Sequence, residues 1–216
     1  MLEKMANFFE NRISDYDEHM RRDIFGAKEF YPFTAACLPA CPGAKVLDLG
    51  CGTGLELEDY YKINKSADIT GIDLSQGMLK KLAQKFPDKK LTLICGSYFE
   101  EDMGLEVFDA AVSVESLHHF TKEEKIPLYK KLFGALKSGG YFILTDYFAD
   151  TTKREEFFAK ELLRLKKENG INDNEFYHYD TPLTVEHETQ ALLSAGFTSV
   201  KVLKSWENTY TLKAQK

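Results

Sequence analysis

The sequence predicts an α/β fold built on a doubly wound, mostly parallel β-sheet. Short apolar runs alternate along the chain with longer stretches whose apolar residues recur at helical spacing. The short runs are apolar at consecutive positions, which is typical of parallel strands that helices cover on both faces. With 216 residues, of which 44% are hydrophobic, the chain can bury the core of a single domain over residues 1–216.

The expected elements follow this alternation in order. Strands are predicted at Val46–Leu49, Ile69–Ile72, Leu91–Cys95, Phe108–Val114 and Tyr141–Thr145. Helices are predicted between them at Leu55–Tyr61, Gln76–Phe86 and Lys122–Leu136, with Gly139 and Gly140 as a helix stop before the fifth strand. Two further helices, Thr152–Asn169 and Pro182–Ala195, precede a final strand pair at Thr198–Leu203 and Asn208–Leu212.

The first 40 residues lie outside this alternation. Their apolar residues recur at helical intervals and predict an amphipathic helix: Phe8, Phe9, Ile13, Tyr16, Met20 and Ile24. Two interpretations stay open, because this helix can pack on the domain as plain structure or can also cover a ligand cleft. The expected organisation is an N-terminal helical cap at 1–40, a ligand-binding core at 41–150, and C-terminal helices with the final strand pair at 151–216.

Charge and composition exclude several classes of function. A net charge of -6 and a pI of about 5.5 argue against a nucleic-acid partner, because phosphate binding needs a basic surface. The basic stretch Lys160–Lys167 is interpreted as a solvated helix face. No apolar run has signal-peptide length or approaches the ~20 residues that span a membrane, so we expect a cytoplasmic chain that does not bind membranes.

The four cysteines, Cys37, Cys41, Cys51 and Cys95, are expected to be reduced thiols. Cys37 and Cys41 resemble half of a zinc site, but no second cysteine pair and no His-rich partner follow them in the sequence. The sequence therefore predicts no metal.

Three glycines at alternate positions follow the first strand in the stretch VLDLGCGTGL. Gly50, Gly52 and Gly54 predict a tight turn where a ligand meets bare backbone at the carboxyl end of a strand. A dinucleotide fingerprint would read G-x-G-x-x-G, but Leu55 stands where the last glycine is required. Asp48, two residues before the first glycine, disfavours a pyrophosphate and suits a ligand that carries a cation.

A second acid, Asp73, ends the second strand about 20 residues beyond the glycine turn. An ionised carboxylate only accepts hydrogen bonds, and its two oxygens can take both hydroxyls of a ribose. Asp48, the glycine turn and Asp73 together indicate a nucleoside whose other end is cationic rather than phosphorylated.

On these residues, the sequence resembles the class I S-adenosylmethionine-dependent methyltransferases of the small-molecule type. VLDLGCGTG is similar to their first motif, GIDLS to their ribose-binding acid, FDAAVSVESLHHF to their fourth-strand motif, and LKSGGYFILTDY to their glycine-bounded fifth strand. The match runs from about Ala44 to Tyr147. The resemblance implies a Rossmann-like, seven-stranded sheet with helices on both faces and an antiparallel last strand. It also implies S-adenosylmethionine as the cofactor and S-adenosylhomocysteine as its product.

The resemblance also implies which residues hold the cofactor. Asp48 would act near the methionine end, Asp73 at the ribose and Met78 against the adenine. The full implied set is Asp48, Gly50, Cys51, Gly52, Gly54, Asp73, Leu74, Met78, Ser97, Tyr98 and Glu115. Ser97 and Tyr98 depart from the family pattern, which often has an acid or an asparagine after the glycine that follows the third strand. Adenine is therefore expected to be read by backbone amides or by the uncharged Ser97.

Methyl transfer to an acceptor needs mainly positioning, because the sulfonium is already activated and the reaction is an in-line displacement. A base is needed only if the acceptor keeps its proton. The candidates are Glu115, His118 and His119 after the fourth strand, and histidine is favoured because its ordinary pKa is about 6.5. The alternative is that both histidines merely shape the pocket.

Aromatic residues are expected around the acceptor. Asp146 and Tyr147 end the fifth strand, and Tyr16 and the run FYHY at 176–179 come from the cap regions, where a plain lid or core role is the alternative. The expected substrate-pocket residues are Tyr16, His119, Tyr147 and Tyr177. They favour an aromatic, partly apolar acceptor.

Motifs that the chain lacks narrow the choice to a small-molecule acceptor. The Asn/Asp-Pro-Pro-Tyr/Phe signature of amino-methylating DNA and protein enzymes is replaced by Val114–Leu117, and Asp146 lacks the neighbour that a catechol-type magnesium site needs. Two rival functions stay open: a non-catalytic binder of S-adenosylmethionine or its product, and a nicotinamide-dependent oxidoreductase, which Leu55 disfavours. A second copy of the chain is a candidate partner, because the final strand pair with Trp206 could form a dimer face.

Overall fold

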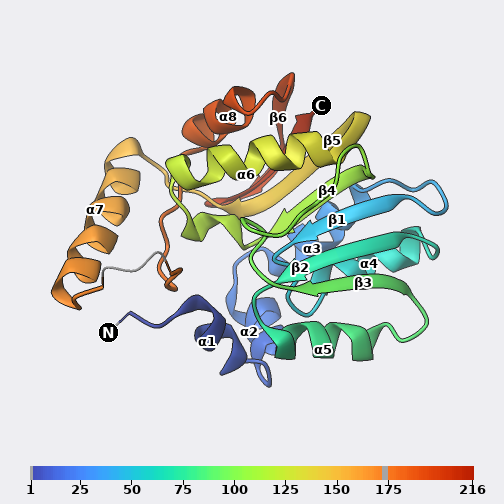
Figure 1. Cartoon of the computed structure of the whole chain (residues 1–216), viewed down its shortest axis with the longest axis horizontal. Helices are drawn as coiled ribbons and strands as arrows, with labels where there is room; N and C mark the ends of the chain where they lie inside the picture. Colours follow the sequence, from blue (N-terminus) through green and yellow to red (C-terminus); the bar gives the residue numbers. More distant parts are fainter. Residues whose placement is uncertain (1, 172–174) are drawn as a thin grey trace.

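The protein is described by a computed structural model that covers residues 2–171 and 175–216. Its centre is a seven-stranded sheet in the order β3-β2-β1-β4-β5-β7-β6 (Figure 1). The strands are β1 Lys45–Leu49, β2 Asp68–Asp73, β3 Lys90–Cys95, β4 Phe108–Val114, β5 Leu136–Tyr147, β6 Ser199–Trp206 and β7 Thr209–Gln215. The pairs from β3 to β5 are parallel, and β7 runs antiparallel to both β5 and β6. The predicted doubly wound sheet with an antiparallel last strand is confirmed.

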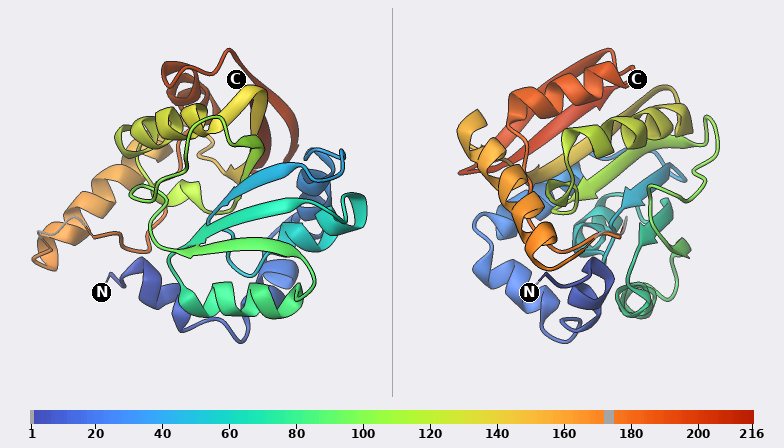
Figure 2. Two further views of the ribbon diagram at one scale, coloured as in Figure 1. Left: turned by 45° about the vertical axis from the view of Figure 1, so that its right-hand side comes forward. Right: turned by 60° about the vertical axis from the view of Figure 1, so that its left-hand side comes forward.

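Helices cover both faces of this sheet (Figure 2). They are α1 Met5–Glu10, α2 Tyr16–Asp23, α3 Ala27–Ala36, α4 Leu55–Ile63, α5 Gln76–Lys85, α6 Lys122–Ala135, α7 Thr152–Glu168 and α8 Val185–Ser194. Successive strand residues point to opposite faces, so Leu47 packs in one core with α6 and α8. Its neighbour Val46 packs in a second core with α3, α4 and α5. This double burial explains the continuous apolar runs of the strands.

The N-terminal cap differs from the single amphipathic helix expected between residues 8 and 24. The chain forms two short helices, α1 and α2, with a turn at 11–15 between them. Asn11, Ser14 and Asp15 lie in that turn, and such residues favour turns over helix interiors because their side chains compete for local backbone hydrogen bonds. The apolar spacing alone could not reveal this break.

The sequence reading also missed α3, which begins after Gly26. Gly26 has a φ of 77°, and a Cβ atom at this position would lie 2.7 Å from the Cβ of Trp206. Trp206 is buried against Phe30 and donates its Nε1–H to Glu29 at 2.9 Å. The end of β6 therefore docks onto the cap instead of offering Trp206 as an exposed face.

Two expected boundaries are wrong. Gly139 and Gly140 do not stop α6, which ends at Ala135, because both glycines lie inside β5 where its register with β4 shifts. The helix expected from Pro182 begins only at Val185, after Thr184, whose side chain accepts a hydrogen bond from the His187 amide. A side-chain cap thus sets this start, as is usual for Ser and Thr.

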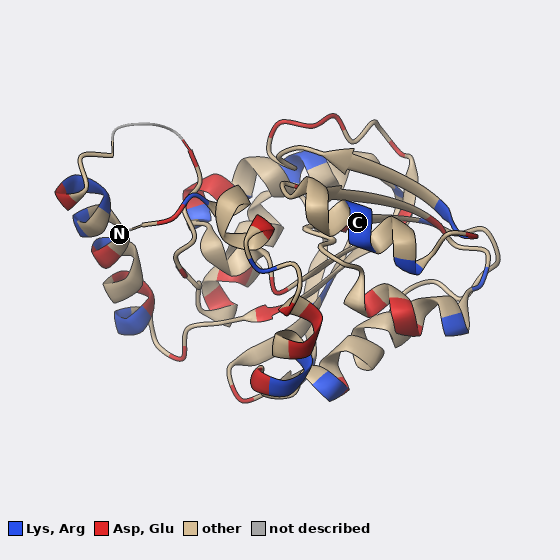
Figure 3. Cartoon of the chain, turned by 90° about the horizontal axis from the view of Figure 1, so that it is seen from below, with Lys and Arg blue, Asp and Glu red and all other residues tan. Residues whose placement is uncertain are grey.

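α7 projects from one side of the molecule and has no buried residue (Figure 1). Basic and acidic residues alternate along it (Figure 3). Arg164 pairs with both Glu161 and Glu168. The basic stretch at 160–167 is thus part of a solvated helix of mixed charge. Within residues 2–171 and 175–216, none of the helices combines the length and apolar character that crossing a membrane requires.

Candidate functional site

The site lies at the carboxyl ends of β1, β2 and β4, where the strand order reverses between β1 and β4. The segments that follow these strands carry the glycine turn, Asp73 and Glu115. The N-terminal cap closes over this edge, and the backbone of residues 3–5 pairs with that of residues 176–178. Ligands of open α/β sheets bind at such a switch point.

The glycine turn has the backbone conformation that its spacing predicts. Gly50, Gly52 and Gly54 have φ values of 71°, 48° and 71°, in the left-handed region that side chains disfavour. A Cβ at Gly50 would lie 2.1 Å from Ser116 Oγ, whereas a Cβ at Gly52 meets only Tyr16, at 3.9 Å. Gly50 is thus required by packing, and Gly52 keeps open the space between the turn and the cap.

Asp73 is held by two backbone amides. Its Oδ2 accepts the N–H of Gly52 and its Oδ1 accepts the N–H of Ser75, each at 2.8 Å. Burial raises the pKa of the Asp73 carboxyl, and these two hydrogen bonds oppose that rise. Each oxygen keeps a further lone pair for a donor in the cleft.

Asp48 is buried behind the turn with Glu56, a residue that the sequence analysis did not single out. Asp48 Oδ2 and Glu56 Oε1 have no hydrogen-bond partner in the described part of the chain. Burial, with the nearby Glu56, raises the pKa of Asp48, and burial also raises the pKa of Glu56. Two buried acids this close cannot both ionise, so we expect them to share a proton.

A narrow cleft of about 30 Å³ lies between the turn and the cap. Five of the expected cofactor residues line it: Gly50, Gly52, Asp73, Met78 and Glu115. Phe9, Tyr16 and Ser116 complete the lining. Phe9 and Tyr16 come from the cap, so the cap itself narrows the cleft.

The other expected cofactor residues do not line this cleft. Cys51 is buried beneath the turn and Gly54 caps α4. Ser97 Oγ accepts the N–H of Phe99 at 3.3 Å, within its own loop, while Leu74 is half-buried against the core. Tyr98 is buried with its hydroxyl 3.2 Å from Ser116 Oγ.

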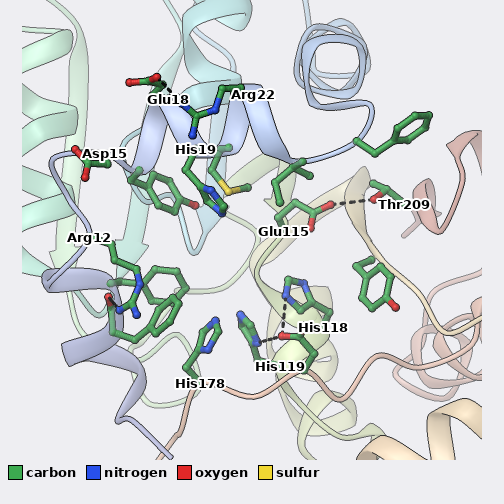
Figure 4. Close-up of a pocket in the computed structure, with 18 of the residues that line it drawn as sticks. Arg12, Asp15, Glu18, His19, Arg22, Glu115, His118, His119, His178 and Thr209 are labelled. Carbon is green, nitrogen blue, oxygen red and sulfur yellow. Dashed lines mark hydrogen bonds and ion pairs between the residues drawn. The ribbon is translucent and has the colours of Figure 1, made fainter.

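A larger cavity of about 840 Å³ adjoins the cleft. Phe9, Tyr16 and Glu115 line both spaces, so the two meet at these residues. The expected residues His118, His119 and Tyr147 also line the cavity, and so do two residues to which no sequence pattern pointed, His178 and Asp180. Tyr177 does not line it: its backbone bridges to Lys4, and the next residue, His178, faces the cavity instead (Figure 4).

The two histidines after β4 have different charges. His118 Nδ1 lies 2.5 Å from Asp146 Oδ1, and Asp146 also accepts the N–H of Leu117 at 2.8 Å. Burial opposes protonation of His118, but the charge and hydrogen bond of Asp146 outweigh it and raise the pKa of His118 to about 9. Burial and the adjacent His118 lower the pKa of His119 to about 4, so His119 is neutral.

Asp180 connects the two rings. Its Oδ1 lies 3.2 Å from His119 Nδ1 and 3.6 Å from His118 Nε2. Burial acts against its ionisation, but His119 and the charge of His118 hold the pKa of Asp180 well below its usual range. Two such sets of side chains bring their ligand atoms within 4.8 Å of one another and could hold a metal ion: His118, His119 and Asp180, and Glu115, His118 and Asp146.

Glu115 occupies the junction of cleft and cavity in an unusual backbone conformation. Its φ of 49° is rare for a residue with a side chain, and such outliers cluster at functional sites. Its Oε1 accepts a hydrogen bond from Thr209 Oγ1 at 3.3 Å. Burial, with repulsion from Asp146, raises the pKa of Glu115 to about 8.

Comparison with known proteins agrees with this geometry. Residues 46–140 match a family model described as a methyltransferase domain. Residues 46–140 are thus a methyltransferase domain, and the fold is that of the class I S-adenosylmethionine-dependent methyltransferases. Two solved structures that share this fold, human N-acetylserotonin methyltransferase and Haemonchus contortus phosphoethanolamine N-methyltransferase 2, hold S-adenosylmethionine.

This methyltransferase is similar to proteins of several named activities. A carboxy-S-adenosyl-L-methionine synthase of Nautilia profundicola is 25% identical over 100% of this chain and 96% of that protein. Phosphoethanolamine N-methyltransferase 1 of Zea mays is 30% identical over 74% of this chain and 29% of that protein. The crystal structure of human N-acetylserotonin methyltransferase in complex with S-adenosylmethionine aligns with a TM-score of 0.63 at 19% identity, over 98% of this chain and 55% of that one.

Proposed function

We propose that this enzyme transfers the methyl group of S-adenosylmethionine to a small molecule bound in the cavity beneath the N-terminal cap. One observation carries the proposal: the cleft at the glycine turn and the cavity meet at Phe9, Tyr16 and Glu115. A cofactor in the cleft and an acceptor in the cavity would therefore face each other at these residues. Holding two reactants in this way can contribute about 7–11 kcal/mol to lowering a barrier.

The residues of the cleft fit the cofactor. S-adenosylmethionine supplies an activated methyl group, a ribose and an adenine. The spare lone pairs of Asp73 suit the ribose hydroxyls, since its two other hydrogen bonds come from the backbone. Gly52 offers bare backbone beside this carboxylate, and the buried Met78 offers an apolar surface for the adenine.

The cap must move for the cofactor to enter, because about 30 Å³ is far less than a nucleoside occupies. α1 is tied to the start of α5 through Glu10, which accepts hydrogen bonds from Ser75 Oγ at 2.6 Å and from the Gly77 N–H at 3.1 Å. Lys81 Nζ adds a bond to the carbonyl of Ile13 at 3.0 Å. These contacts are exposed or half-buried, so water can replace the lost partners when the cap opens.

The histidines take different parts in this proposal. His118 holds a proton at neutral pH because Asp146 stabilises its charged form, so it orients groups rather than accepting a proton. His119 is neutral and can accept a hydrogen bond from the acceptor through its free nitrogen. Neither assignment needs a metal ion.

Product release tests the proposal directly. Purified protein is incubated with S-adenosylmethionine and, separately, with phenols, amines, thiols and carboxylates, and S-adenosylhomocysteine is quantified. Acceptor-dependent release of S-adenosylhomocysteine, with an acceptor that gains one methyl group by mass spectrometry, supports methyl transfer. Tight cofactor binding without transfer to any acceptor would favour a non-catalytic binder instead.

A second candidate is the formation of carboxy-S-adenosylmethionine, favoured by the similarity to the Nautilia profundicola synthase over the full length of this chain. In that case S-adenosylmethionine itself would be the substrate. Mass spectrometry separates the two: a carboxylated nucleoside favours the second candidate, and S-adenosylhomocysteine with a methylated acceptor favours the first.

A further inference from the structure

The cavity has an acidic lining. Five carboxylate side chains line it, from Asp15, Glu18, Glu115, Asp180 and Glu207. Two arginines, Arg12 and Arg22, also line it. The net charge of the cavity depends on whether these two arginines are already paired with carboxylates or can still bind an anion.

Both arginines are already paired. Arg22 pairs with Glu18 at 2.8 Å (Figure 4). It also pairs with Asp23 at 2.8 Å. Arg12 lies 3.4 Å from Glu3 and donates to the carbonyl of Phe8 at 2.9 Å. These pairs balance the charges of both arginines and also that of Glu18, so neither the arginines nor Glu18 sets the charge of the cavity.

The part of the cavity around His118, His119 and Asp180 is negative. His118 carries the one full positive charge of the histidine cluster, but it faces two acids, Asp146 at 2.5 Å and Asp180 at 3.6 Å. His119 lies 3.2 Å from Asp180 and adds no charge, because it is neutral. The positive charge of His118 balances only one of the negative charges of Asp146 and Asp180. These three groups therefore carry a net charge of about -1, to which an ionised Glu115 would add.

Aromatic rings surround this acidic end. Phe9 and Tyr16 from the cap and Tyr147 from β5 line the cavity. The face of an aromatic ring attracts a cation, and this attraction grows when the site excludes water. Acids and aromatic faces together form a site suited to an organic cation with an apolar body.

We propose that the acceptor is an amine, bound as its ammonium form with Glu115 as its anionic partner and proton acceptor. This inference rests on the proposed methyl transfer and names the substrate class. One N–H bond of the ammonium breaks, its proton moves to a carboxylate oxygen of Glu115, and nitrogen keeps the electron pair. That pair forms the new bond to the methyl carbon of S-adenosylmethionine, the bond from this carbon to sulfur breaks, and its electron pair stays on sulfur, so S-adenosylhomocysteine is the leaving group. Acceptors that are carboxylates would meet like charges here.

The ionisation of Glu115 supports this assignment. Asp146, Asp180 and His118 face it, together with the hydroxyl of Thr209. Since burial raises its pKa to about 8, Glu115 holds its proton at pH 7, and an adjacent cation would favour the ionised form. Binding of an ammonium ion at pH 7 should therefore release a proton.

Calorimetry with three ligands that share a phenyl ring on a short carbon chain and differ in their polar group tests the inference. The ligands are 2-phenylethylamine, 2-phenylethanol and phenylacetate. Each is titrated at pH 7 into the protein saturated with S-adenosylhomocysteine, and into the cofactor-free protein, in two buffers of different ionisation enthalpy. We expect the amine to bind at least tenfold more tightly than the alcohol and to release close to one proton. Phenylacetate should bind more weakly than both.

Matched variants assign the effect to the cavity. Glu115→Gln keeps the shape of the side chain and should remove both the amine preference and the proton release. Glu123→Gln, on the exposed first turn of α6, removes the same charge elsewhere and should change neither. Asp180→Asn should reduce the amine preference in a second, independent way.

Equal binding of the three probes, tighter binding of phenylacetate, absence of amine binding, or an unchanged preference in Glu115→Gln would each overturn the inference. Failure of S-adenosylhomocysteine to bind would instead count against the proposed function. The amine preference is still measured then, because the cofactor-free protein retains the cavity.

Discussion

The carboxylate of Asp73 offers a quantitative test of the cofactor site. Each of its oxygens accepts one backbone N–H, from Gly52 or Ser75, and leaves one lone pair for a ribose hydroxyl. Asp73→Asn turns one oxygen into an amide NH₂ group, which then faces a backbone N–H that also needs an acceptor. The variant loses one ribose hydrogen bond and weakens the other by removing the charge.

The expected magnitude follows from these bonds. A hydrogen bond to a charged group contributes about 1.5–3 kcal/mol, so the loss of one bond and the weakening of another come to roughly 2–4 kcal/mol. At about 1.4 kcal/mol per factor of ten, binding of S-adenosylhomocysteine should weaken roughly 30- to 1,000-fold. Isothermal titration calorimetry measures this affinity for Asp73→Asn and the wild type.

A matched control separates the ribose contacts from general effects. Asp88→Asn makes the same change in an exposed turn before β3 and should leave the affinity unchanged. Circular dichroism should show that both variants keep the fold. An affinity of Asp73→Asn within threefold of the wild type would refute the assignment of Asp73 to the ribose.

Three further changes probe the cleft, the core and the titration of the site. Gly52→Val should abolish S-adenosylmethionine binding in calorimetry with little change in circular dichroism, because the new side chain enters the space in front of Tyr16, 3.9 Å away. Lys125→Met should lower the free energy of unfolding in urea by roughly 3–5 kcal/mol, because Glu188, 2.6 Å from Lys125, stays buried without a countercharge. The wild type should lose stability between about pH 6.5 and about 9 more steeply than His118→Asn, because the pKa of His118 is raised to about 9 in the folded state.

A different outcome would contradict the expectation for each of these variants. Retained binding in Gly52→Val would mean that no ligand approaches this backbone. Lys125→Met combined with Glu188→Leu should recover stability, and a double variant as unstable as Lys125→Met would argue against the buried charge as the cause. The sign of the pH effect follows from proton binding: the folded state holds the His118 proton that the unfolded state releases, so rising pH favours unfolding. Parallel pH profiles of the two proteins would contradict it.

Local patterns predicted the sheet and the glycine turn because the physics behind them is local. A strand buried on both faces must be apolar throughout, as in Phe108–Val114. The left-handed backbone at Gly50 and Gly52 needs residues without a side chain, and Asp73 ends a strand at the same edge. The spacing of these residues along the chain was therefore enough to predict that they lie in one cleft.

Residues that only the folded chain brings together could not be predicted in this way. Glu10 reaches Ser75 across 65 positions, and Asp180 reaches His118 from the segment after α7. The run at 176–179 signalled aromatic residues near the pocket, but the strand-like bridge of Tyr177 to Lys4 decides which side chain faces inward. The alternation of side chains along this run does not predict which of them face the cavity, because a shift of the strand pairing by one residue turns every side chain to the other face.

Titration of the wild-type protein with S-adenosylmethionine and, separately, with S-adenosylhomocysteine decides whether the glycine turn, Asp73 and the cap form a cofactor cleft. We expect both ligands to bind at one site per chain with micromolar affinity, and Gly52→Val to bind neither. No heat of binding for either ligand, at concentrations up to the millimolar range, would contradict the assignment of the glycine turn, Asp73 and the cap to a cofactor cleft.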